Sequence, residues 1–147
     1  MEFVLAFVAA FIAACDAYNF APLDVEPCVS GGEFAEIATP YCEAGKECKA
    51  GAGSRFQLRF TGMNRERYPL YLSVWADVRS INHPGDSFVY SSNCQSEWTN
   101  YPCVAQPGRN VTGYVAIKIP SSFKKSLTRI FFNVDGIGCG SMHIWVS

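Results

Sequence analysis

The sequence lacks the residue patterns on which most enzymes and metal proteins depend. Its 147 residues include only two histidines, His83 and His143, which are distant from each other in the chain. No H-E-x-x-H or G-x-S-x-G motif occurs, and no two cysteines have the C-x-x-C spacing typical of redox sites. We therefore expect no catalytic residues, no metal ligands and no cofactor, and we interpret the chain as a non-enzyme.

An excess of either charge sign is also absent. Lysine and arginine number 12 against 13 aspartates and glutamates, so the formal charge is −1. A chain this close to neutral gives no electrostatic reason to expect a nucleic-acid partner. Apolar residues do not recur at the 3.6-residue spacing of an amphipathic helix, and no apolar run after residue 17 is long enough to cross a membrane.

The first 17 residues, MEFVLAFVAAFIAACDA, are the one long apolar stretch. The run is shorter than the roughly 20 residues of a membrane-spanning helix and ends in small residues, as a secretory signal peptide does. We predict cleavage after Ala17, with Cys15 at the −3 position. An alternative is a bacterial lipoprotein box at Ile12 to Cys15, which the absence of Lys and Arg before it disfavours.

Cysteine is the residue that is plentiful. Of seven cysteines, six follow the predicted signal peptide, and an even number in a small secreted chain predicts three disulfides. Cys42 and Cys48 are separated by five residues, whereas zinc sites usually have closer pairs with further cysteine or histidine ligands nearby. Six cysteines allow 15 pairings. Proximity in the chain favours the two short pairs, Cys42 with Cys48 and Cys94 with Cys103.

The remaining sequence alternates between apolar and polar residues in short runs bounded by turn residues, which is the pattern of half-buried strands. We expect strands at 33–39, 54–60, 69–78, around 88–90, 110–120, 127–134 and in the last nine residues. Asp135-Gly136 predicts a hairpin between the last two. Because the sequence contains no linker-like segment and no repeat, residues 18–147 are expected to form one all-β sandwich domain.

The order of these features resembles the ML family, the MD-related lipid-recognition domains. Within it, the pattern is most similar to the secreted Niemann–Pick type C sterol carrier and a related group of house-dust-mite allergens. The resemblance rests on Cys28, PYCEAGKECKAGAGSRFQLRFTG, NCQSEWTNYPC, KIP at 118–120 and SLTRIFFNVDGIGCGSMHIWVS. It implies an immunoglobulin-like β-sandwich of about seven strands, with two sheets splayed around an apolar cavity. It also implies the disulfides Cys28–Cys139, Cys42–Cys48 and Cys94–Cys103.

The resemblance further implies a secreted lipid-binding or lipid-transfer protein that holds a sterol, fatty acid or similar molecule between its sheets. The inward strand faces then supply the pocket walls, and Phe88 belongs to the pocket mouth. A filled core is the alternative interpretation of the same faces. The candidate lipid-pocket residues are Phe56, Leu58, Phe60, Leu72, Val74, Phe88, Val115, Ile117, Ile130, Phe132, Val134, Met142 and Ile144.

A second interpretation is an extracellular recognition module, either a lipid-presenting immune co-receptor or a glycan- or protein-binding sandwich. Trp75 and Trp145 fall on outward strand faces and Trp98 in a loop, where exposed aromatic rings can anchor a partner. The expected partners are a hydrophobic small molecule and a membrane or receptor protein that takes it over. We expect the protein to be secreted or delivered to the lysosomal lumen. We also expect a glycan on the sequon asparagine, Asn110.

Overall fold

The computed structural model describes residues 20–40, 42 and 47–147. The predicted signal peptide and most of the loop between Cys42 and Cys48 lie outside these residues. The described chain is all-β, as expected, and contains no helix. Its strands are β1 (Ala21–Pro22), β2 (Glu26–Pro27), β3 (Glu36–Thr39), β4 (Lys49–Ala50), β5 (Arg55–Met63), β6 (Leu70–Tyr71), β7 (Ser73–Ser80), β8 (Ser87–Asn93), β9 (Thr99–Asn100), β10 (Val104–Ala105), β11 (Asn110–Lys118), β12 (Ser126–Val134) and β13 (Gly138–Val146).

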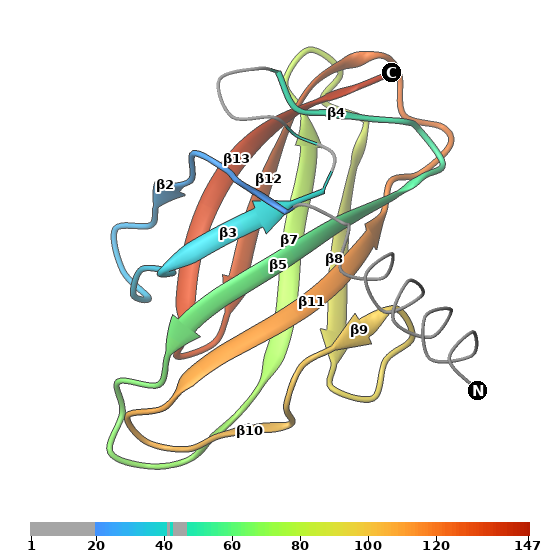
Figure 1. Cartoon of the computed structure of the whole chain (residues 1–147). Helices are drawn as coiled ribbons and strands as arrows, with labels where there is room; N and C mark the ends of the chain where they lie inside the picture. The colour runs from blue at the N-terminus through green and yellow to red at the C-terminus, as the bar shows by residue number, and fades with distance from the viewer. Residues whose placement is uncertain (1–19, 41, 43–46) are drawn as a thin grey trace, which may run out of the picture.

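These strands form two packed sheets. Sheet A has the order β1-β3-β5-β11-β9, and sheet B the order β2-β13-β12-β7-β8, with β4 paired in parallel to β13. The short strands β6 and β10 pair with each other. Figure 1 shows β3, β5 and β11 as one layer in front of β7, β8, β12 and β13. The β-sandwich architecture predicted from the sequence is therefore confirmed.

Strict alternation explains why the long strands pack as they do. In β5 every second residue from Phe56 is buried, and in β11 the buried set is Val111, Gly113, Val115 and Ile117. Because successive side chains of a strand point to opposite faces, the apolar set of each strand lies against the other sheet. The strand between 69 and 78 differs from the prediction. It is divided at Leu72, whose N–H donates to the Cys103 carbonyl instead of to a neighbouring strand.

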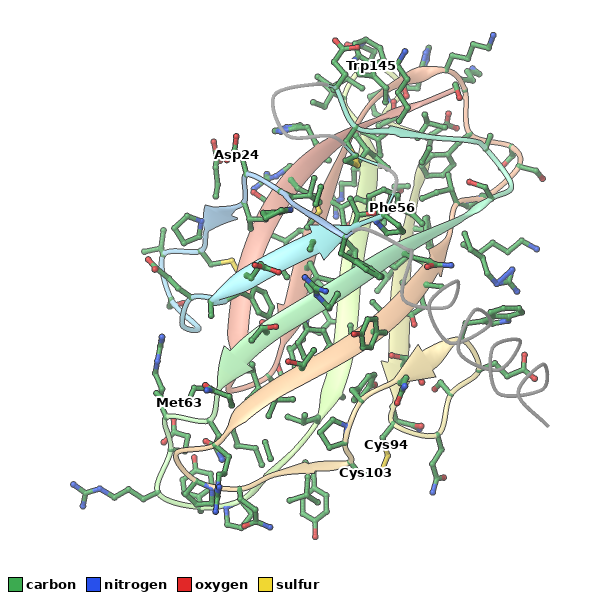
Figure 2. All side chains as sticks on the ribbon, in the orientation of Figure 1. Asp24, Phe56, Met63, Cys94, Cys103 and Trp145 are labelled. Atoms are coloured by element: carbon green, nitrogen blue, oxygen red, sulfur yellow. A yellow bond between two sulfur atoms is a disulfide. The ribbon has the colours of Figure 1, made fainter. Side chains whose placement is uncertain are left out.

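The three disulfides join Cys28 to Cys139, Cys42 to Cys48 and Cys94 to Cys103, the pairs that the family resemblance implies. The first closes a separation of 111 residues and ties the N-terminal segment to β13. Figure 2 shows Cys94 and Cys103 near one end of the sandwich, on the side of β8 and β9. The frame of the domain is thus fixed covalently at both edges.

Candidate functional site

All thirteen predicted pocket residues belong to one apolar interior between the sheets. Twelve of them are exposed by 4% or less, five of those at 0%, and Phe88 is half-buried. A void large enough for a water molecule would give the side chains that line it some accessible surface. These twelve side chains have almost none, so the packing around them is tight. The open cavity expected between the sheets does not appear around them. An empty apolar void forfeits van der Waals contacts, which favours closure when no ligand is bound.

Three phenylalanines, two from strands and one from a loop, meet at the centre of this interior. The rings of Phe60 on sheet A and Phe132 on sheet B lie 6.0 Å apart, and Phe34 inserts beside them at 6.1 and 5.6 Å. Phe34 comes from the loop before β3 and was not among the predicted residues. A Cβ atom on Gly138 would lie 2.6 Å from the Phe34 ring, so this glycine makes the room that Phe34 occupies.

The segment from Ala21 to Ile37 closes one edge of the sandwich, and we call it the strap. Its first strand, β1, pairs with β3 of sheet A, and its second, β2, pairs with β13 of sheet B. Leu23 and Val25 between them are partly buried against the core. A hollow of about 180 Å³ lies under the strap, bounded by Leu23, Val25, Phe34, Ile37 and Cys139 among others.

Two further aromatic residues close one end of the sandwich. Loop 119–125 crosses from β11 in sheet A to β12 in sheet B and carries Phe123, which meets Phe88 edge-on with ring centres 5.8 Å apart. Asp86 in the β7–β8 turn accepts a hydrogen bond of 2.8 Å from the Lys124 backbone N–H. Phe123 was missed by the sequence interpretation because it lies in a polar turn, where no alternation marks an inward residue.

The opposite end is closed by a polar network. Asn64 is fully buried and donates hydrogen bonds to the carbonyls of Tyr68, at 3.0 Å, and Ala105, at 2.9 Å. Its side-chain oxygen accepts from the Glu66 N–H at 2.9 Å. Because breaking this network would leave the buried Asn64 amide unsatisfied, this end resists opening.

Two buried hydroxyls, on Thr39 and Tyr90, have no hydrogen-bond partner among the described residues. The Tyr101 and Ser92 hydroxyls lie 3.0 Å apart and satisfy each other. The buried Tyr90 hydroxyl, on the same inward face of β8, has no hydrogen-bond partner. Burial raises the phenol pKa of both Tyr90 and Tyr101, so both stay neutral well past neutral pH. Sequence alternation alone could not distinguish these tyrosines from exposed ones.

The tryptophans singled out from the sequence have different surroundings. Trp75 stacks on Phe131, with ring centres 5.4 Å apart, and both border an open groove of about 600 Å³ on the outer face of sheet B. Trp145 is 37% exposed and Trp98 is 62% exposed. The sequon asparagine, Asn110, is exposed at the start of β11. Within the described residues, no cluster of three or more His, Cys, Asp or Glu side chains could hold a metal ion.

Comparison with known proteins identifies the fold. No family model and no curated protein matches the sequence. Among solved structures, the chain is similar to a Niemann–Pick type C2 protein from the Japanese carpenter ant, with a TM-score of 0.59 and 11% sequence identity. The match covers 88% of this chain and 99% of the ant protein. The chain therefore has the β-sandwich fold of that protein along nearly its whole length.

Proposed function

We propose that this protein is a secreted lipid-binding or lipid-transfer protein that holds one sterol, fatty acid or similar hydrophobic molecule between its two sheets. Its fold is that of a Niemann–Pick type C2 protein, and the cysteine order of the sequence resembles the ML family. The thirteen predicted pocket residues all contribute to one apolar interior. A ligand held there replaces side-chain contacts with its own apolar surface, at roughly 25 cal/mol per Å² removed from water.

The single observation that carries this proposal is the one apolar interior between the sheets, on whose wall the Tyr90 hydroxyl has no hydrogen-bond partner among the described residues. A buried hydroxyl without a partner costs about 1–3 kcal/mol, and an apolar interior gains nothing by retaining one. A ligand with an apolar body and one polar group, such as a hydroxyl or carboxyl, would satisfy Tyr90 while its body lies among the phenylalanines. The site thus favours an amphiphile with a single polar head over a pure hydrocarbon.

In this proposal the mouth lies at the Phe88–Phe123 contact. Tyr90 is the next inward residue of β8 after Phe88, so the polar head of the ligand would stay near the mouth. Opening this end moves two rings and a turn, whereas opening the Asn64 end would break three hydrogen bonds of a fully buried side chain. Secretion or lysosomal delivery, cleavage of residues 1–17 and a glycan on exposed Asn110 belong to the same proposal.

The direct test is native mass spectrometry of the protein purified from secreting eukaryotic cells, before and after organic extraction. We expect a lipid-sized mass that extraction removes. We also expect Tyr90→Phe to weaken binding of a fatty acid about tenfold while leaving binding of the matching alkane unchanged, since one hydrogen bond is lost. A protein that is always empty and takes up neither sterols nor fatty acids would rule the proposal out.

A further inference from the structure

The outer face of sheet A carries a small, ordered array of side chains. The register pairs Arg55 with Lys118, Gln57 with Ala116 and Arg59 with Tyr114 across β5 and β11. On the other side of β11, Asn100 of β9 pairs with Tyr114, and the Trp98 carbonyl accepts a 3.0 Å hydrogen bond from the Ala116 N–H. Ala116 therefore lies between Gln57 and Trp98, with Tyr114 two residues away on one side and Lys118 two residues away on the other.

A hollow lies over this array because its central residue is small. Its volume is about 220 Å³, and its lining includes Phe20, Gln57, Trp98, Asn100, Tyr114 and Ala116. Phe20 meets Tyr114 edge-on with ring centres 5.6 Å apart, which forms an aromatic wall at one end. Drug-sized ligands occupy pockets of about 300–1,000 Å³, so this hollow suits a single ring.

Trp98 combines two unfavourable features. Its φ is 62°, which makes it the only non-glycine residue in the described chain with a positive φ. A bulky side chain rarely adopts this left-handed conformation, and glycine would adopt it without strain. The indole is also 62% exposed. Backbone strain and exposed aromatic surface at one residue are typical of ligand-contact positions.

The charges beside the hollow are not balanced. Arg59 forms a 2.6 Å ion pair with Glu36. Arg55 and Lys118, which face each other across the strands, have no ion-pair partner among the described residues. Like charges directly opposite one another in a sheet repel, so a bound anion would stabilise this pair. The Arg55 guanidinium lies 4.2 Å from the centre of the Trp98 ring, so this cation lies beside an aromatic side chain that lines the hollow.

We propose that this hollow, independently of the lipid interior, binds one ring of an acidic saccharide. The apolar C–H face of a pyranose packs on Trp98 and Tyr114, and its hydroxyls exchange hydrogen bonds with the amides of Gln57 and Asn100. Its carboxylate meets Arg55 and Lys118, the one unpaired cation pair on this face.

The test uses the protein purified from secreting eukaryotic cells, with its own glycans removed enzymatically. Tryptophan fluorescence and NMR titrations measure binding of methyl β-glucuronide, the methyl glycoside of N-acetylneuraminic acid, and neutral methyl β-glucoside. We expect at least one acidic glycoside to bind with a Kd of about 0.1–1 mM, at least about fivefold tighter than the neutral sugar. Ala116→Leu fills the floor and should abolish this binding without lowering the unfolding temperature, since the side chain faces outward.

The matched control is Thr61→Leu, on the same outward face of sheet A but outside the lining of the hollow, which should bind as the unaltered protein does. Trp98→Gly removes the ring and the backbone strain together and should lose binding while the fold is retained. Lipid binding should be unchanged in all three variants, so failure of either proposal can be recognised separately. The inference is overturned if neither acidic glycoside binds, if Ala116→Leu binds as tightly as the unaltered protein, or if the array instead binds phosphatidylglycerol vesicles.

Discussion

Gly113 lies on the inward face of β11, opposite Phe60. A Cβ atom at this position would lie 2.4 Å from the Phe60 ring and 2.6 Å from the Tyr101 Cβ atom. The contact is with a fully buried ring, which cannot swing away into solvent. The absence of a side chain at residue 113 is therefore what allows Phe60 and Tyr101 to fill this part of the interior.

We expect Gly113→Ala to lower the free energy of unfolding by about 1–3 kcal/mol, because the added methyl group overpacks the core. Urea unfolding followed by tryptophan fluorescence measures the change. Gly85→Ala is the matched control, since nothing lies within 4 Å of a Cβ atom there, and its effect should be small. Equal effects of the two substitutions would show that Phe60 is free to shift and that the interior is looser than its burial indicates.

Burial of Tyr90 and Tyr101 predicts a sensitivity to alkaline pH. The phenol pKa of each is raised by burial. The stability linked to a raised pKa is complete below the unfolded-state pKa of about 10 and is lost as the pH rises through the folded-state pKa. We expect two of the seven tyrosines to ionise late, together with unfolding, in an absorbance titration of the phenolate. Tyr90→Phe with Tyr101→Phe should remove this late phase, whereas Tyr71→Phe, 83% exposed, should not.

The residues that the sequence could predict are those within long alternating strands. Twelve of the thirteen predicted pocket residues are buried, and eleven of these lie in β5, β7, β11, β12 or β13, where period-two alternation reports the inward face directly. Phe34 and Phe123 were missed because each enters the interior from a loop. Whether these buried residues contact a ligand is a separate question, since alternation indicates which side chains point inward and not which of them contact a ligand.

The strap is the element whose role the sequence concealed. Its strands have two residues each, too short to show alternation, and they belong to different sheets. It is held by the Cys28–Cys139 disulfide and by two hydrogen-bonded pairings, and it keeps Phe34 in place between the sheets. Elements this short are specified by a covalent link and by tertiary contacts, neither of which leaves a local sequence pattern.

We expect loss of the strap disulfide, in Cys28→Ala with Cys139→Ala, to destabilise the protein more than loss of the short one, in Cys94→Ala with Cys103→Ala. In the chain-entropy model the long loop contributes roughly 4.7 kcal/mol and the short loop roughly 2.5 kcal/mol. Hydrogen exchange followed by mass spectrometry should show faster exchange in β1 and β3 for the first variant. Faster exchange confined to β8 and β9 in that variant would contradict the proposed role of the strap.

Across the whole molecule, the fold is specified by features that tolerate extensive sequence change. The described chain shares 11% identity with the ant protein, yet the two align over 88% of this chain. Alternating strand faces need only apolar residues of suitable size, and disulfides fix the edges whatever lies between them. This is why the cysteine order and strand pattern predicted the architecture. Under the proposed function, the same tolerance would leave ligand identity to a few residues such as Tyr90.

Under the proposed function, ligand exchange involves the whole sandwich, because a ligand held between the sheets can leave only when one boundary of the interior opens. Phe123 and Phe34 are the two aromatic residues that close a boundary from a loop, one at the β7–β8 end and one beneath the strap. The strap edge is fixed by a disulfide and by strand pairing on both sides. The other end is held by a ring contact, by the Lys124–Asp86 hydrogen bond and by the buried Ser80–Ser126 hydroxyl pair, with no disulfide among the described residues. We therefore expect ligands to pass at Phe123.

Stopped-flow dissociation of a fluorescent fatty acid tests this route. Phe123→Ala should raise the dissociation rate about tenfold, equivalent to about 1.4 kcal/mol off the opening barrier. Phe34→Ala should lower the free energy of unfolding at least as much as Phe123→Ala does, since the Phe34 ring packs on Phe60 and Phe132. It should nevertheless change the dissociation rate less than about threefold. Comparing the two variants distinguishes a specific exit path at Phe123 from an effect of lowered overall stability on ligand release. If Phe34→Ala accelerates release more than Phe123→Ala does, the ligand passes beneath the strap and the mouth must be reassigned to that edge.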